Sequence, residues 1–507
     1  VKHHTSISFV LEQTMKIVNV SFDGRDDETC LTGNENRSCK TLHYIVKNIK
    51  GNTRINIGKM YVNKSKQIFC TSQKIILRTI RDYRFVIYGG NSELKHDLPN
   101  IHSCSLQIQA SFFAKNRMIT FHRASFFSVN ISVSNITIKF ISCTFVNVGV
   151  KTIEKLKDIY LNLILVNNTW KHVEYTEKFA VFNINTIFFN NLCALHLDIS
   201  KSTLSNMHIM VKSKYFSIAM VSVNYLYDSN MHIPYPFGIK LEREYVAFIP
   251  HNMIKLHRVT VKGLNKTDLE ADKQETQISF LEILFENILV IMVNCEFFYT
   301  SHVVRFKNEI NRRENDGIFL KLYAERCTFC NIRSAQRGGG IMIMLPNHIT
   351  PLMLAEITLT KNIFSNIVTR GHGGAIYIDS KVYHSLNNQS VIIKMQNCRF
   401  INCKTTGNGG SVFIGNYIKA KMQNVSFLYT ERVQYSGYGL FIFSKGELVI
   451  FNVTFVLNKS VIYHTNVMQA KYLARVRTFY LRCPDWNSVS VSYPGHLSVS
   501  VSCKSCQ

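Results

Sequence analysis

Proline and tryptophan are scarce in this chain, with 8 prolines and 2 tryptophans in 507 residues. So little proline excludes a proline-rich linker or a polyproline scaffold. Phenylalanine and tyrosine are plentiful, at 34 and 23 residues, and hydrophobic residues make up 46% of the chain. This composition favours β-strands around a large core over disorder.

Acidic residues are also few, with 33 Asp and Glu against 59 Lys and Arg, which gives a formal net charge of +26. Such a surface is expected to attract polyanions: acidic glycans, anionic lipid headgroups or nucleic acid. The alternative is that the charge is spread evenly and only keeps the protein soluble, because no run of Lys and Arg forms a local patch.

The common catalytic and cofactor signatures are missing. We find no Walker loop, dinucleotide fingerprint, serine-nucleophile elbow or HExxH sequence, so no cofactor is expected. Nucleic-acid binding would need a basic patch interleaved with aromatic residues on a recognised module, and we expect no such partner. The most apolar stretch, 278–298, contains Glu282, Glu286 and Glu296, which argues against a membrane span and for buried strands.

Cysteines and glycosylation sequences indicate a secreted protein. The chain has 14 cysteines and 11 Asn-x-Ser/Thr sequences, a combination typical of an oxidising, extracellular setting. No signal peptide is visible and the chain begins at Val1, so we expect a fragment whose targeting or membrane segment lies outside it. The predicted glycosylation sites are Asn19, Asn36, Asn63, Asn130, Asn135, Asn167, Asn265, Asn388, Asn424, Asn452 and Asn458.

A repeat occupies 327–455. Glycine pairs begin at Gly338 or Gly339, Gly373 and Gly409, with a degraded copy at Gly437, and each opens a short apolar run. Steps of 35 and 36 residues separate positions 338, 373 and 409, which accommodates one solenoid coil of three short strands and three turns. The glycines are expected where the chain needs positive φ or close approach between coils.

A second phrase, built on phenylalanine, precedes each glycine pair. Like residues of parallel coils stack along the solenoid axis, so these positions predict an interior aromatic ladder and an asparagine ladder that bonds backbone groups at a bend. The aromatic ladder would consist of Phe329, Phe364, Phe400, Phe427 and Phe455, and the asparagine ladder of Asn331, Asn366 and Asn402.

The first 52 residues predict a cap for the open end of the solenoid. Residues 16–22 alternate like a strand, Cys30 and Cys39 flank a polar loop and are the easiest disulfide to propose, and 42–49 has a helical apolar stripe. A helix across the first coil would cover its unpaired backbone groups.

The predicted organisation is an all-β, right-handed parallel β-helix with this strand and helix cap. It comprises the cap at 1–52, the β-helix at 53–480 and the start of a Cys-rich module at 481–507, with Cys483, Cys503 and Cys506 as further disulfide candidates. Three prolines interrupt the rhythm near 225–275, which indicates either an inserted or irregular coil, or a boundary between two solenoid blocks.

The glycine phrase after the phenylalanine phrase resembles the repeats of chlamydial polymorphic outer-membrane proteins and of eukaryotic pectin-lyase-like β-helix proteins. Residues 18–62 resemble the N-terminal cap and first coil of the same eukaryotic group. The bacterial repeat has Phe-x-x-Asn, whereas this chain mostly has Phe-x-Asn. The resemblance implies an extracellular β-helix. The tail from Cys483 is similar to the entry of a Cys-rich receptor module.

His372 is the candidate catalytic residue, since pectin-degrading hydrolases of this fold use a Gly-His-Gly sequence. Such hydrolases also need clustered carboxylates, and here the neighbourhood offers Asp379, so a turn residue is the better interpretation. Cys327 with Cys330, and Cys398 with Cys403, have spacings that look like metal motifs. No histidine follows at the usual distance, so we expect no metal, and instead stacked thiols or disulfides between coils.

These observations predict a non-catalytic, extracellular or cell-surface protein for adhesion or ligand recognition, which presents a basic face to acidic glycans or to other extracellular proteins. Two alternatives stay open. One is a polysaccharide lyase or glycoside hydrolase of the pectin-lyase-like fold, in which Asp379, His372, Arg370 and Glu356 would converge. The other is a purely structural surface protein.

Overall fold

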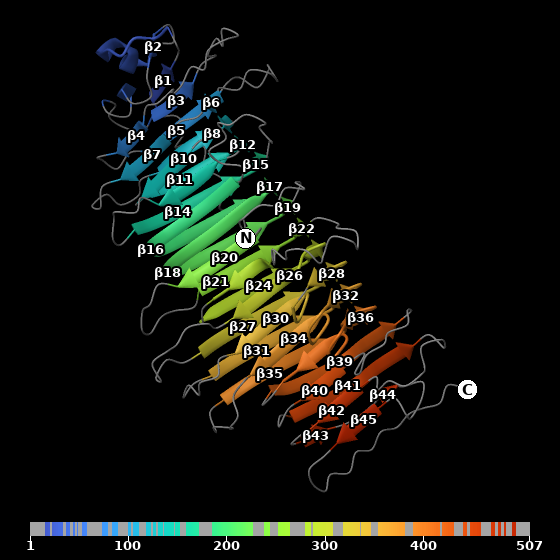
Figure 1. Ribbon diagram of the computed structural model, residues 1–507. Helices are drawn as coiled ribbons and strands as arrows, with labels where there is room; N and C mark the ends of the chain where they lie inside the picture. Colours follow the sequence, from blue (N-terminus) through green and yellow to red (C-terminus); the bar gives the residue numbers. More distant parts are fainter. Residues whose placement is uncertain are drawn as a thin grey trace, which may run out of the picture. The chain divides into compact units, whose positions relative to one another are not determined.

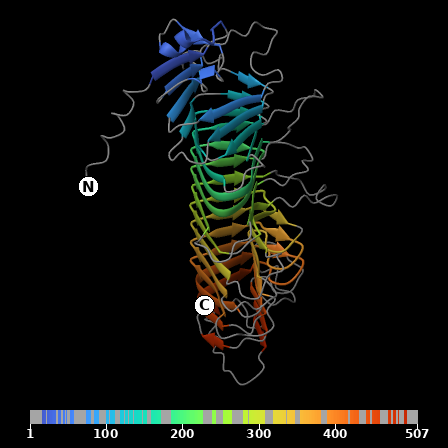
Figure 2. The same cartoon turned by 90° about the vertical axis from the view of Figure 1, so that its left-hand side faces the viewer.

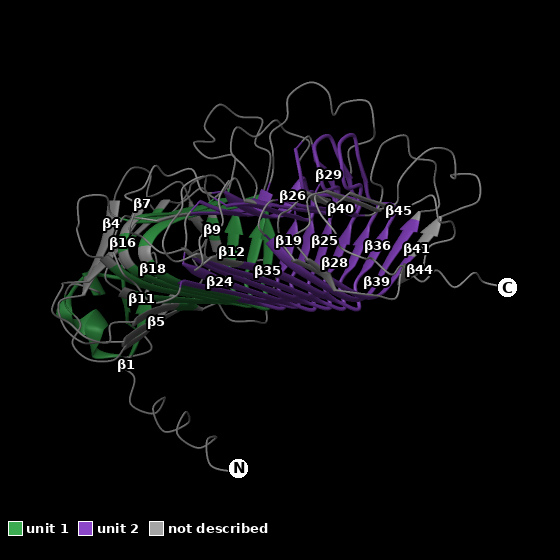
Figure 3. Cartoon of the chain, turned by 90° about the horizontal axis from the view of Figure 1, so that it is seen from below, with its two compact units in different colours: residues 1–219 green, residues 220–507 purple. Residues whose placement is uncertain are grey.

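The computed structural model describes residues 16–20, 23–33, 37–40, 44–45, 48, 53–57, 74–79, 84–89, 100–102, 105–110, 118–122, 125–127, 130–134, 136–146, 148–152, 159–171, 185–226, 238–243, 252–263, 279–284, 287–307, 318–334, 336–345, 353–380, 389–415, 418–429, 440–443, 447–457, 468–471, 475–477, 481–482 and 489–492. Within them the fold is all-β, a parallel β-helix as the sequence predicts, in which each strand pairs in parallel with its counterpart one coil away (Figure 1). The chain divides into two compact units, 1–219 and 220–507 (Figure 3).

Each coil contributes to three sheets, called here the long-strand face, the short-strand face and the third face. In the first unit, the long-strand face contains β1 (Lys16–Val20), β3 (Thr53–Ile57), β5 (Arg84–Gly89), β8 (Met118–His122), β11 (Ile136–Ile141) and β14 (Ile159–Val166). The short-strand face contains β6 (Asn100–His102), β9 (Ser125–Phe127), β12 (Thr144–Val146), β15 (Thr169–Lys171) and β17 (Thr203–Ser205). The third face contains β4 (Lys74–Thr79), β7 (Ser105–Ala110), β10 (Asn130–Ser134) and β13 (Gly149–Thr152). Two long strands, β16 (Asn185–Ser200) and β18 (Met207–Val221), follow, and β16 pairs with strands of both the third and the long-strand face.

The second unit repeats this arrangement. Its long-strand face contains β21 (Asn252–His257), β24 (Ile288–Val293), β27 (Ile318–Glu325), β31 (Met353–Thr360), β35 (Gln389–Gln396), β39 (Ile418–Tyr429), β41 (Glu447–Leu457) and β43 (Arg475–Arg477). The short-strand face contains β19 (Asn224–Leu226), β22 (Thr260–Lys262), β25 (Glu296–Phe298), β28 (Thr328–Cys330), β32 (Ile363–Ser365), β36 (Arg399–Ile401), the second halves of β39 and β41, and β44 (Leu481–Arg482). The third face contains β20 (Gly238–Arg243), β23 (Ser279–Ile283), β26 (His302–Lys307), β30 (Ile341–Leu345), β34 (Ile376–Ser380), β38 (Val412–Ile414), β40 (Leu440–Phe443), β42 (Met468–Lys471) and β45 (Val489–Ser492). A separate small sheet contains β29 (Arg333–Ser334), β33 (Val368–Thr369) and β37 (Lys404–Thr405).

Strands of the second unit lie in the segment 225–275, where the sequence predicts an interruption, and beyond residue 480, where it predicts the end of the β-helix. Inside 225–275, β20, β21 and β22 pair in register with the strands of the next coil. At the other end, β45 pairs with β42, so parallel pairing continues to Ser492, beyond the predicted end of the β-helix at residue 480. The boundary between the compact units, at 219/220, lies just before the proline-containing segment.

Both corners that flank each short strand use left-handed backbone. At the corner before the strand, Arg326, Lys361 and Asn397 have φ between +52° and +56°. At the corner after it, Asn331 and Asn366 have φ of +54° and +53°. Each such corner turns the chain in one residue, and asparagine is the non-glycine residue that tolerates this conformation best. Two fixed corners therefore hold the three-residue strand in the same place in successive coils. Figure 2 shows how strands of successive coils stack in parallel.

An aromatic column fills the interior behind the short strands. Phe297, Phe329, Phe364, Phe400 and Phe427 are fully buried, and neighbouring rings stack with centroids 4.5–5.2 Å apart. Phe455 is in register with Phe427 on the next strand. The first unit has its own column, in which Phe126, Phe145 and Trp170 stack. Parallel register puts large rings at the same depth in every coil, so their burial supports coil-to-coil packing.

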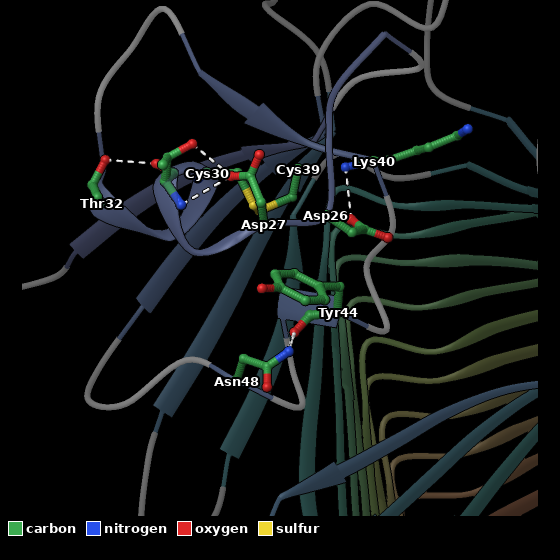
Figure 4. The surroundings of a disulfide bond; sticks show 9 residues. Asp26, Asp27, Cys30, Thr32, Cys39, Lys40, Tyr44 and Asn48 are labelled. Atoms are coloured by element: carbon green, nitrogen blue, oxygen red, sulfur yellow. Dashed lines mark hydrogen bonds between the residues drawn. A yellow bond between two sulfur atoms is a disulfide. The ribbon is translucent and has the colours of Figure 1, made fainter.

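The cap contains a disulfide between Cys30 and Cys39 (Figure 4). A short 3-10 helix, η2 (Glu28–Thr32), begins at Asp27, whose carboxylate accepts hydrogen bonds from the backbone N–H groups of Thr29 and Cys30. The strand β2 (Ser38–Cys39) pairs with β1. Of the predicted helix 42–49, the described residues Tyr44, Ile45 and Asn48 are helical, and Ile45 is buried.

Candidate functional site

The glycine phrases form a column of stacked turns that leads into the third face. Gly338, Gly373 and Gly409 all have positive φ, between +59° and +70°. Backbone hydrogen bonds join these turns coil to coil, for example from the N–H of Gly338 to the carbonyl of Gly373 at 2.9 Å. A Cβ on Gly374 would overlap the carbonyl oxygen of Gly410, so close approach between coils excludes a side chain there.

The turns bring a polar and aromatic cluster together on the outer side of the third face. Met342, Tyr377 and Phe413 lie side by side in register on β30, β34 and β38, and each is at most 8% exposed. The guanidinium of Arg337 stacks on the ring of Tyr377 and donates a hydrogen bond to its hydroxyl at 2.6 Å. The Tyr377 hydroxyl in turn donates to Asp379 at 2.8 Å. Burial, followed by the Asp379 charge, raises the pKa of Tyr377 well above its usual value.

His372 lies at the edge of this cluster as a turn residue. Its ring stacks on Phe413, and its Nδ1 accepts a hydrogen bond from the backbone N–H of Asn408 in the next coil at 2.9 Å. Partial burial, with the positive charge of Arg337, lowers the pKa of His372. The imidazole is therefore a neutral acceptor that links two stacked turns.

The residues that a glycosidase would use do not come together. Asp379 belongs to the cluster on the third face, whereas Glu356 lies on the long-strand face, where it pairs with Lys394 at 2.6 Å and Lys321 at 3.7 Å. Arg370 lies in the turn beside His372, and its backbone N–H bonds the carbonyl of Ser334. The cluster thus brings one carboxylate, that of Asp379, to His372, and acid/base hydrolysis of a glycoside needs two.

A serine–histidine contact, which sequence reasoning did not single out, lies under the glycine turns. His302 is completely buried, and its Nε2 lies 3.0 Å from the Ser334 hydroxyl and 3.1 Å from the carbonyl of Arg337. Among the described residues none hydrogen-bonds to its Nδ1, so no carboxylate in that part of the chain completes a catalytic triad with it. Burial lowers the pKa of His302 to about 3, which keeps the ring neutral.

The asparagines divide into two kinds. Exposed Asn366 donates to the side-chain oxygen of Asn331 at 3.2 Å, a side chain to side chain bond where the sequence predicts bonds to the backbone. Asn402 has the same left-handed corner conformation in the next coil. Backbone groups at the corner are bonded by buried Asn362, which accepts from the N–H of Cys327 and donates to the carbonyl of Ala324. The Phe-x-Asn pattern identified the corner asparagines Asn331, Asn366 and Asn402, but it did not identify buried Asn362.

Five of the predicted glycosylation sites fall within the described residues. Asn167, Asn424 and Asn452 lie at the left-handed corner before a short strand, and Asn167 and Asn424 are exposed. Asn19 lies in β1 and is partly buried, and Asn130 is the first residue of β10. The sites Asn36, Asn63, Asn135, Asn265, Asn388 and Asn458 lie outside the described residues, as do Cys483, Cys503 and Cys506.

Basic side chains gather on the long-strand face of the second unit. The group, called here the lysine surface, consists of Lys321, Lys394, Lys419 and Lys421. Lys394 and Lys421 are register partners on β35 and β39, and Lys419 is the partner of Ile392. Lys394, Lys419 and Lys421 are exposed, and Glu356 is the single acidic residue of β31, β35 and β39. With Glu356 included, the surface carries a net charge of +3.

Comparison of the chain with protein-family models, with curated proteins and with solved structures finds no match. Across the described ranges no helix is long and apolar enough to cross a membrane. The same residues contain no group of three or more His, Cys, Asp or Glu side chains placed to hold a metal ion.

Proposed function

We propose that this protein is a secreted or cell-surface glycoprotein that recognises acidic glycans without cleaving them. The observation that carries the proposal is the lysine surface. Its ammonium groups project from neighbouring strands, which lie about 4.8 Å apart in a sheet. A sheet face is flat, so an extended polyanion can contact several strands at once, and the local positive potential favours its approach.

Three further features support this proposal. The Cys30–Cys39 disulfide fits maturation in an oxidising compartment. The likeness of the head and repeats to eukaryotic extracellular β-helix proteins suggests the same setting, and adhesion is a function such a scaffold could serve. Arg337 donates a hydrogen bond to Tyr377, and Tyr377 donates to Asp379, which fits a structural cluster better than a hydrolytic centre.

Binding to immobilised heparin and to polygalacturonate, measured over a range of salt concentrations, tests the proposal. The variant Lys394→Gln/Lys419→Gln/Lys421→Gln should bind roughly tenfold more weakly, if each exposed charge contributes about 0.5 kcal/mol. It should also show a shallower salt dependence, because fewer counterions are displaced.

The matched control is Lys151→Gln/Lys171→Gln/Lys262→Gln, which removes the same charge from exposed positions on the other two faces. Its binding should change much less. An equal loss in both variants would show that diffuse charge, and not the lysine surface, holds the glycan. If the wild-type chain binds neither polymer, the result would favour a purely structural surface protein. If the chain shortens either polymer, the result would favour a polysaccharide lyase or glycoside hydrolase.

A further inference from the structure

The residue that precedes each short strand lies at one inward position, and in two successive coils this residue is cysteine. Cys295 precedes β25 and Cys327 precedes β28, and the two strands pair residue for residue from Glu296 and Thr328 onward. The two cysteines are therefore neighbours, one coil of 32 residues apart. Both are free thiols in the structure and at most 1% exposed.

This placement meets the backbone separation that a disulfide needs. Neighbouring strands are about 4.8 Å apart, and disulfide-bonded cysteines have Cα atoms roughly 4.4–6.8 Å apart. Cys398, at the same inward position three coils after Cys295, provides a contrast. Asn362 and Val425 stand before and after it in the column, so its thiol meets no sulfur there.

We propose that Cys295 and Cys327 are joined by a disulfide in the mature protein, which closes one coil of the solenoid into a covalent ring. The requirement is maturation where disulfides form, which the Cys30–Cys39 bond already indicates. The inference does not depend on glycan binding, so failure of either proposal leaves the other standing.

The bond forms by thiol–disulfide exchange with an oxidant that is itself a disulfide, either a protein disulfide or oxidised glutathione. One of the two cysteines attacks one sulfur of the oxidant as its thiolate, the oxidant's S–S bond breaks, and one thiolate leaves. The other cysteine then loses its proton and attacks the protein sulfur of the mixed disulfide, which releases the second thiolate. Two cysteine thiols are oxidised and one external disulfide is reduced to two thiols.

Both sulfurs are inaccessible in the closed coil, so the exchange takes place before this coil closes during folding. Either thiolate can make the first attack at that stage, because the thiolate is the reactive form and neither thiol is yet buried.

Mass spectrometry of the whole chain, secreted from eukaryotic cells behind a heterologous signal peptide, tests the proposal. The protein is denatured and alkylated without reductant, digested and analysed before and after reduction. We expect a linked pair of peptides that contain Cys295 and Cys327 and that separate on reduction. Cys30 and Cys39 must be linked in the same sample, as the control for oxidation, and Cys398 must be alkylated.

Full alkylation of Cys295 and Cys327 in a sample whose Cys30–Cys39 bond is intact would overturn the proposal. Linkage of either residue to another cysteine would do the same. A second measurement compares thermal unfolding of wild type, Cys295→Ser and Cys398→Ser with and without reductant. The proposal expects reductant to lower the Tm of wild type and of Cys398→Ser more than that of Cys295→Ser, which has already lost the bond.

Discussion

The side-chain amide of Asn452 donates a hydrogen bond to the side-chain oxygen of Asn424 at 2.8 Å, and Asn424 donates in the same way to Asn397 at 3.0 Å. All three have φ between +51° and +54°, so the exposed amides form a ladder along the corner before the short strands. The bonds of this ladder run from side chain to side chain across three consecutive coils, in addition to the backbone pairing of the strands.

Replacing Asn424, the middle residue of this ladder, separates the contribution of its amide hydrogen bonds from that of its left-handed backbone conformation. Asn424→Ala loses both amide hydrogen bonds and places a Cβ in left-handed backbone, which should lower the free energy of unfolding by about 1–2 kcal/mol. Asn424→Gly loses the bonds but relieves the backbone, so its cost should be smaller. Urea denaturation of both variants measures the difference, and a glycine variant less stable than the alanine variant would contradict this account of the corner.

Ser426→Ala tests the predicted glycan on Asn424 without touching the ladder. A glycosylated asparagine keeps one amide N–H, which is sufficient for the bond to Asn397. We expect the secreted variant to lose the mass of one N-linked glycan while its stability stays within about 0.5 kcal/mol of wild type. The mass of the intact protein reports the first effect and thermal unfolding the second. An unchanged mass would show that the site is unoccupied.

Phe364 tests the aromatic column. Its ring is fully buried and stacks on Phe329 at 4.5 Å and on Phe400 at 4.9 Å. Phe364→Ala should therefore cost about 3–5 kcal/mol in unfolding free energy, through lost burial and the cavity that remains. The neighbouring Ile363 is 37% exposed, and Ile363→Ala serves as the control on the same strand. Equal unfolding free energies for the two variants would show that the aromatic column does not stabilise the core.

Buried His302 makes stability depend on pH. Burial holds its folded pKa at about 3, below the usual 6.5, so the unfolded chain binds one more proton than the folded chain between these values. His302 therefore contributes full stability above pH 6.5, and stability falls as the pH drops toward 3, by at most about 1.4 kcal/mol per pH unit. We expect the unfolding free energy of His302→Gln, measured from pH 7 to 4, to depend less steeply on pH than that of wild type. An unchanged slope would show that other groups cause the pH dependence.

Gly374 tests the close approach of the glycine turns. A methyl group there would meet the Gly410 carbonyl, which is backbone and cannot rotate away. Gly374→Ala should destabilise the second unit by more than 1 kcal/mol, in contrast to the gain usual for Gly→Ala where the backbone and the space allow it. The next residue in the chain, Ala375, is fully buried yet already carries a Cβ, and Ala375→Gly is the control. A stabilised Gly374→Ala would rule out the predicted overlap.

The sequence predicts the coil well because stacking repeats residues at fixed depth. Phe329, Phe364 and Phe400 have constant spacing from the glycine turns, so their alignment follows from the repeat. The lysine surface was not found in this way. Lys394 and Lys421 are 27 residues apart, the same spacing as Phe400 and Phe427, but the aligned positions of β31 and β27 carry Thr358 and Tyr323, so no repeated lysine marks the surface in the sequence.

The contacts within the cluster on the third face were equally hidden. Arg337 and Tyr377 are 40 residues apart, and their contact depends on how the glycine turn folds back over the next coil. His372 was found from its sequence context, but its acceptor role toward Asn408 follows from the register of stacked turns. The sequence therefore identifies which residue types lie near the glycine turns, whereas the contacts between their side chains depend on how each turn folds, which the repeat pattern does not show.

The unequal coils also show where this scaffold accepts change. Eight residues connect β34 to β35, whereas three connect β38 to β39, and the corners and short strands on both sides keep the same register. The connection from the third face to the long-strand face is thus a natural insertion point. A foreign peptide epitope placed there, for example between β38 and β39, should be displayed without disturbing the fold, which would make the chain a usable display scaffold.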